Sequence, residues 1–61
     1  MLNKIYTLEE YKAQGFTNEE LPLIKEHDEL HNRLVSGNYE TTEEYESIRK
    51  RIFELVEILG L

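Results

Sequence analysis

The chain has no cysteine and no tryptophan, and only one proline among its 61 residues. Without cysteine it forms no disulfide and no thiolate metal site, a composition that fits a reducing compartment. Basic residues are also scarce, because 7 Lys and Arg stand against 13 acidic residues, giving a net charge of −6. Binding to nucleic acid or to an anionic membrane needs Lys and Arg facing phosphates. We therefore expect no direct contact with either.

Long hydrophobic stretches are missing as well. No apolar run approaches the roughly 20 residues of a membrane span, and residues 1–6 lack the apolar core and cleavage site of a signal peptide. We therefore expect a cytoplasmic location. A chain of this length forms one domain at most, and such a domain rarely gains more than about 3–5 kcal/mol from its core without covalent staples. Unusually good helix packing, a second copy or another protein must then complete the fold.

Three Thr-x-Glu-Glu boxes mark predicted helix starts. They begin at Thr7, Thr17 and Thr41. In such a capping box the Thr hydroxyl accepts from the N–H three residues on, while the second Glu reaches back to the Thr N–H. The glutamates also place negative charge where the helix dipole favours it. Apolar residues flank the first two boxes as hydrophobic staples, pairing Tyr6 with Tyr11 and Phe16 with Leu21.

Hydrophobic periodicity gives the extent and arrangement of the helices. The predicted helices cover about residues 8–14, 18–36 and 42–59. Pro22 either bends the middle helix or restarts it after a separate turn. In the last helix Tyr45, Ile48, Ile52, Leu55 and Leu59 recur in steps of three and four, which is a heptad seam. About five residues join the second and third helices, a length typical of antiparallel neighbours. The sequence predicts an all-α, three-helix domain over 1–61, with a short N-terminal helix packed on an antiparallel helical hairpin.

The stretch from His27 to His31 is the one that resembles a metal motif. Two histidines at i and i+4 on one helical face can both reach a zinc ion, as in the His-Glu-x-x-His motif of metalloproteases. Here Asp28 takes the position of the general base, and no downstream residue supplies an obvious third ligand. We therefore interpret His27 as a core-edge residue and His31 as half-exposed. No metal, no cofactor and no enzymatic activity are expected.

Large apolar side chains remain after the core has been assigned. Phe53 and Ile58 lie outside the heptad seam, on opposite flanks of the last helix. Tyr39 lies in a polar loop, and Leu61 follows the last helix. Surplus apolar and aromatic side chains are typical of interfaces. These four residues form the predicted partner-binding set.

Three functions are compatible with these features. The leading prediction is a non-enzymatic interaction module, a small acidic helical inhibitor or adaptor on a larger protein, whose acidic residues steer a basic partner surface. Short acidic chains of this kind are common in phage and mobile elements, which is the origin we expect. The second prediction is an obligate homodimer in which two hairpins form a four-helix bundle. The third is a mimic of nucleic-acid phosphates that blocks a nucleic-acid-binding protein.

Overall fold

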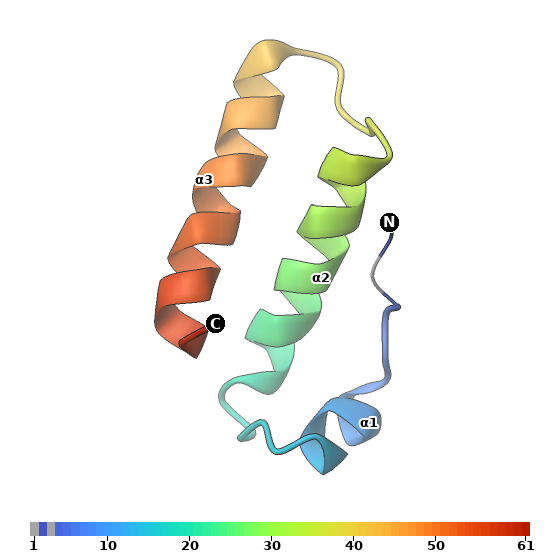
Figure 1. The fold of residues 1–61 in the computed structure, drawn as a ribbon, viewed down its shortest axis with the longest axis vertical. Helices are drawn as coiled ribbons and strands as arrows, with labels where there is room; N and C mark the ends of the chain where they lie inside the picture. Colours follow the sequence, from blue (N-terminus) through green and yellow to red (C-terminus); the bar gives the residue numbers. More distant parts are fainter. Residues whose placement is uncertain (1, 3) are drawn as a thin grey trace.

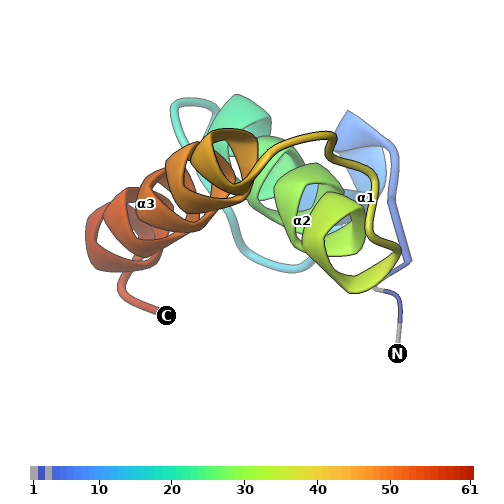
Figure 2. The same ribbon diagram turned by 90° about the horizontal axis from the view of Figure 1, so that it is seen from above.

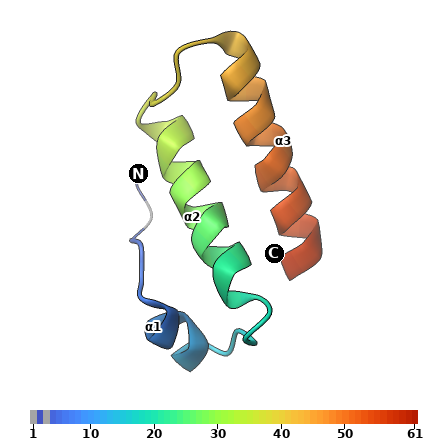
Figure 3. The same cartoon turned by 180° about the vertical axis from the view of Figure 1, so that it is seen from behind.

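The computed structural model describes residue 2 and residues 4–61. This part of the chain contains three helices and no strand, namely α1 (Leu8–Ala13), α2 (Leu21–Val35) and α3 (Thr42–Leu59). Helices α2 and α3 form an antiparallel hairpin, and α1 packs against α2 (Figure 1). Views from above and from behind place α2 between the other two helices (Figure 2 and Figure 3). The predicted fold class is confirmed.

Helix α1 begins at the first capping box. The Glu10 N–H donates to the Thr7 hydroxyl at 3.2 Å, and the Thr7 N–H donates to the Glu10 carboxylate at 3.1 Å. Two backbone donors that the first turn leaves unpaired are thereby satisfied. Outside the cap, the rings of Tyr6 and Tyr11 meet edge to face with their centroids 5.3 Å apart. This contact is the predicted staple, and it fixes how the chain enters the helix.

The second box forms, but it caps a turn that precedes α2. The Thr17 N–H donates to the Glu20 carboxylate at 2.9 Å, and the Glu20 N–H donates to the Thr17 hydroxyl at 3.3 Å. Residues 18–20 form the turn, and α2 begins at Leu21 with Pro22 in its first turn. A proline at that position loses no hydrogen bond, because the N–H groups of a first turn have no helical partner. Of the two alternatives at Pro22 the restart is observed, and α2 is shorter than the predicted range of 18–36.

The start of α3 is capped at Thr41, as predicted, with a shift in the reciprocal bond. The Thr41 hydroxyl accepts from the Glu44 N–H at 3.1 Å. The Glu44 carboxylate accepts from the Glu40 N–H at 3.1 Å, one residue before the cap. The third box therefore satisfies the same number of donors as a regular capping box, although one of them belongs to the preceding loop.

Helix α3 ends at a left-handed glycine. Gly60 has φ 70° and ψ 32°, and the next residue, Leu61, donates its N–H to the Val56 carbonyl at 3.0 Å. This is the usual way in which a terminal turn satisfies its last carbonyl groups, and it favours glycine because a Cβ is disfavoured at positive φ. The bounds of α3 agree with the prediction of 42–59.

Few side chains are fully buried. The buried hydrophobic residues of the described chain are Tyr11, Leu21, Ile24, Ile48 and Leu55. The first three form a cluster between α1 and α2, against which Tyr6, Phe16 and Leu59 pack. The other two belong to the heptad seam of α3, whose remaining members are half-buried. A core this small leaves many apolar side chains at the surface.

Candidate interaction surface

All four residues of the predicted partner-binding set are exposed. Tyr39 retains 36% of its accessible surface, Phe53 57%, and Ile58 and Leu61 58% each. The Tyr39 ring packs against the ring of Tyr45 in the first turn of α3, with the centroids 5.2 Å apart. The exposed fractions agree with the expectation that the core cannot cover these side chains. Whether they bind a partner stays a prediction.

The structure does not gather the four residues into one patch. Phe53 and Ile58 are five positions apart on α3, so at about 100° per residue they point roughly 140° away from each other. Tyr39 precedes α3 and Leu61 follows it, which places them at opposite ends of that helix (Figure 1). One flat surface can therefore cover Phe53 or Ile58, and not both.

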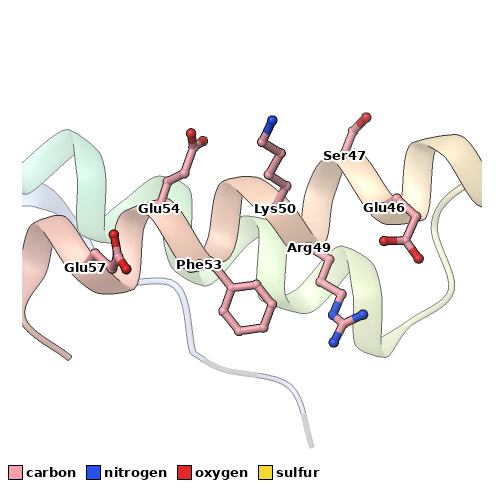
Figure 4. Close-up of a pocket in the computed structure, with 7 residues that line it drawn as sticks. All are labelled: Glu46, Ser47, Arg49, Lys50, Phe53, Glu54 and Glu57. Carbon is pink, nitrogen blue, oxygen red and sulfur yellow. The ribbon is translucent and has the colours of Figure 1, made fainter.

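Phe53 lies in a shallow depression on the outer face of α3. The depression is lined by Glu46, Ser47, Arg49, Lys50, Phe53, Glu54 and Glu57. Phe53 is the one apolar side chain among them, and both signs of charge surround it. Phe53 and Arg49 project from one side of the helix, and Lys50 and Glu54 from the other (Figure 4). We call this group the Phe53 surface.

Arg49 orients the exposed ring. Its guanidinium carbon lies 5.4 Å from the centroid of the Phe53 ring, within the range of a cation–π interaction. The two residues are one helical turn apart, at i and i+4, where side chains on a helix surface meet. The contact limits the rotamers of Phe53, so burial of the ring would cost less side-chain entropy than for a free side chain.

Four exposed apolar residues were not singled out from the sequence. They are Leu2, Ile5, Leu8 and Val35. Three lie before or at the start of α1, and the fourth, Val35, is the last residue of α2, where its apolar side is left uncovered. Their apolar side chains can be read from the sequence, but their exposure depends on which helices and loops pack over them. Single exposed apolar residues are normal on protein surfaces.

A bidentate ion pair fixes α3 against α2. The Arg51 guanidinium donates to both carboxylate oxygens of Glu26, at 2.8 and 3.0 Å. The hydrogen bonds from Arg51 hold the pKa of the Glu26 carboxyl below its usual range, and the same pair raises the pKa of Arg51. The fork defines an orientation as well as a distance, and it adds to the register that the buried Ile48 and Leu55 give α3. The Phe53 surface lies on the outer face of that helix.

A chain of polar contacts ties α1 to α2. The Tyr11 hydroxyl donates to Asp28 Oδ2 at 2.7 Å and accepts from the Tyr6 N–H at 3.3 Å. The other Asp28 oxygen, Oδ1, lies 3.0 Å from His27 Nδ1. Burial, followed by the hydrogen bond to Asp28, raises the pKa of Tyr11 to about 12. The buried phenol therefore stays protonated at neutral pH and acts as a structural donor.

The two histidines do not form a metal site with a third residue. Their rings stack with centroids 6.4 Å apart, and the described residues contain no group of three or more His, Asp or Glu side chains that could hold an ion. The His27 side chain is 15% exposed and hydrogen-bonded to Asp28, which agrees with its interpretation as a core-edge residue. His31 is half-buried.

The acidic residues of the three capping boxes lie at opposite ends of the molecule. The boxes before α1 and α2 lie at the lower end in Figure 1, and the box before α3 lies at the upper end. In each box the second glutamate accepts a backbone hydrogen bond. Three of the 13 acidic residues are thus used in capping bonds, and the glutamates of the boxes do not form one stripe.

Comparisons with known proteins add nothing to what the fold and the Phe53 surface show. Searches against protein-family models, curated proteins and solved structures found no match to the chain. In the described residues, no helix has both the length and the apolar character needed to cross a membrane.

Proposed function

We propose that this chain is a non-enzymatic interaction module, a small inhibitor or adaptor that binds a protein partner through the Phe53 surface. The observation that carries the proposal is the position of Phe53. Its ring is more than half exposed, is held by Arg49, and is surrounded by charged side chains. An aromatic anchor within a polar rim is the usual composition of an interface hot spot.

The scaffold under this surface supports the same function. Phe53 belongs to an 18-residue helix that is capped at both ends and packs on α2 through a seam with Ile48 and Leu55 buried. A surface on a rigid element loses little conformational entropy when it binds, and this favours affinity. Binding by such a helix needs no active-site cleft.

The net charge of −6 favours a partner with a basic surface. Opposite charge accelerates the diffusional encounter and contributes more to the association rate than to the final affinity. We therefore expect association to slow as ionic strength rises, because salt screens exposed charges beyond about 10 Å at 0.1 M. The dissociation rate should change little.

The test compares two substitutions on α3. Phe53→Ala and Ile58→Ala each remove an apolar side chain of nearly equal exposure, 57% and 58%, from opposite flanks of the helix. The full chain, immobilised, is used to capture partners from a lysate of its native host, followed by mass spectrometry and affinity measurement. Phe53→Ala should weaken binding of the captured protein by about 2 kcal/mol or more, while Ile58→Ala should leave it nearly unchanged.

The opposite result would refute the proposed surface. If Ile58→Ala loses the partner and Phe53→Ala retains it, binding occurs on the other flank of α3. If both bind normally and replacement of Glu43 and Glu44 by Gln abolishes capture, the acidic groups carry recognition. That outcome would favour the phosphate mimic over the interaction module. Circular dichroism of each variant establishes that the helices are intact.

A further inference from the structure

We infer that His27 and His31 form a two-ligand site on α2 for a divalent transition-metal ion such as Zn²⁺. The site lies on a different helix from the Phe53 surface and does not depend on the proposed function. His27 and His31 are the two histidines of the chain, and both belong to α2. Residues four apart are separated by about 6 Å along a helix axis and about 40° around it, so both imidazoles can reach one ion. Imidazole nitrogen is a preferred ligand of zinc, copper and nickel ions.

Asp28 prepares the His27 ring for this role. Its Oδ1 lies 3.0 Å from His27 Nδ1, and its Oδ2 accepts from the Tyr11 hydroxyl at 2.7 Å. A carboxylate only accepts hydrogen bonds, so Nδ1 carries the ring proton and Nε2 keeps its lone pair. Metal-binding histidines are commonly oriented in this way by a carboxylate on the other ring nitrogen, which also makes the ligand more basic. Asp28 is therefore a positioning residue, and it connects the site to the contact between α1 and α2.

Both rings can be reached from solvent. In the described part of the chain, no buried side-chain nitrogen or oxygen lacks a hydrogen-bond partner. His27 Nε2 makes no hydrogen bond to any described residue, so this atom must be accessible. The His31 ring contacts the His27 ring and likewise makes no hydrogen bond to a described residue. It can therefore turn without breaking a hydrogen bond.

A limited rotation of His31 brings the two nitrogens to one ion. The ring centroids are 6.4 Å apart, and the ring planes differ by 20°. Zinc–nitrogen bonds of about 2.0–2.1 Å in a tetrahedral site place the centroids roughly 5 Å apart. The rings must therefore approach by roughly 1–1.5 Å, which rotation about the side-chain bonds of His31 supplies. The expectation of no metal rested on the missing third protein ligand, and in an open site water takes the remaining positions.

Calorimetric titration of the full chain with zinc chloride tests the site. With two of the four ligands of a structural zinc site, we expect a 1:1 complex with a dissociation constant on the order of 10 µM at neutral pH. His27→Gln and His31→Gln should each weaken binding at least tenfold, because one imidazole remains. Asp28→Asn should weaken it about tenfold, since loss of such an orienting partner typically costs about 10–100-fold.

Glu29→Gln is the matched control for the loss of a carboxylate. Glu29 is exposed and lies two residues from each histidine, so it points about 160° away from both. Its replacement should leave the zinc affinity unchanged. Circular dichroism of each variant checks that the helices are intact.

Nitrogen-15 NMR spectra of the wild type test the site without any substitution. Zinc should shift the ring signals of both histidines, with the larger change at Nε2 of His27. If zinc binds while these signals stay in place, or if the two histidine variants bind as the wild type does, carboxylates hold the ion and the site is refuted. A wild type that binds no zinc up to about 1 mM refutes it too. Equal affinity of Asp28→Asn and the wild type would overturn the role of Asp28, and none of these results bears on partner capture through Phe53.

Discussion

Substituting Tyr11 by Phe removes one oxygen atom from the contact between α1 and α2. Tyr11 is 1% exposed, and its hydroxyl donates to the Asp28 carboxylate while accepting from the Tyr6 N–H. A hydrogen bond to a charged group contributes about 1.5–3 kcal/mol to stability. At roughly 0.05–0.15 kcal/mol per residue, a chain of this length has about 3–9 kcal/mol in total. We therefore expect Tyr11→Phe to lower the free energy of unfolding by about 1.5–3 kcal/mol, a large fraction of the whole.

Urea unfolding followed by far-UV circular dichroism measures this loss. The midpoint should fall without a change in the slope against urea, because the fold and its buried area stay the same. Tyr39→Phe is the matched control, since it removes the same atom from a loop residue that is 36% exposed. Its effect should stay within about 0.5 kcal/mol. A loss below that value in Tyr11→Phe would refute the role assigned to the hydroxyl.

The same variant carries a prediction about pH. Burial and the bond to Asp28 raise the pKa of Tyr11 from 10.0 to about 12. The folded state therefore favours the protonated phenol, so its contribution is complete below pH 10 and is lost as the pH rises from 10 to 12. The difference in stability between wild type and Tyr11→Phe should shrink across that window. A difference that stays constant to pH 12 would contradict the assigned cause.

Three further predictions concern the hairpin. Leu55→Ala, at a residue with no accessible surface, should cost about 2–5 kcal/mol in urea unfolding, whereas Ile58→Ala on the same helix should be nearly neutral. Thr41→Ala removes the acceptor for the Glu44 N–H and should cost about 1 kcal/mol, with a matching loss of helical signal on heating. Glu26→Gln should cost less than about 1 kcal/mol at neutral pH, because the pair with Arg51 is partly exposed. Because Arg51 lowers the pKa of Glu26, the ion pair stabilises the wild type at pH values above the ordinary pKa of a glutamate. Urea titrations of the wild type and of Glu26→Gln should therefore give converging free energies of unfolding as the pH falls below that pKa. A difference in stability that persists in acid would contradict the ion pair as its source.

Helix starts are the part of the fold that the sequence predicts best. A capping box is made by residues three positions apart, so its geometry is decided locally, and all three boxes form hydrogen bonds in the structure. The one wrong boundary lies at α2, where the box at Thr17 and the proline at Pro22 give competing local signals. In the structure the box caps the turn at residues 18–20, and Pro22 lies in the first turn of α2.

The contacts that hold the helices together were not predictable in the same way. Tyr11 is 17 residues from Asp28, and Glu26 is 25 residues from Arg51. Both contacts depend on the rotation and register of one helix against another, which local propensity does not specify. For the interaction surface, the helical period alone indicates that Phe53 and Ile58 diverge. The charged rim around Phe53 follows from the same period once the buried face of α3 is known.

Connectivity has a consequence for how quickly the chain folds. The helices that pack together are α1 with α2 and α2 with α3, so each contact joins neighbours along the chain. Short loops between contacting segments cost little closure entropy, and small helical proteins of low contact order fold in microseconds to milliseconds. Docking of α3 needs only the hairpin to close. The molecule should therefore regain its native state rapidly after dilution from denaturant.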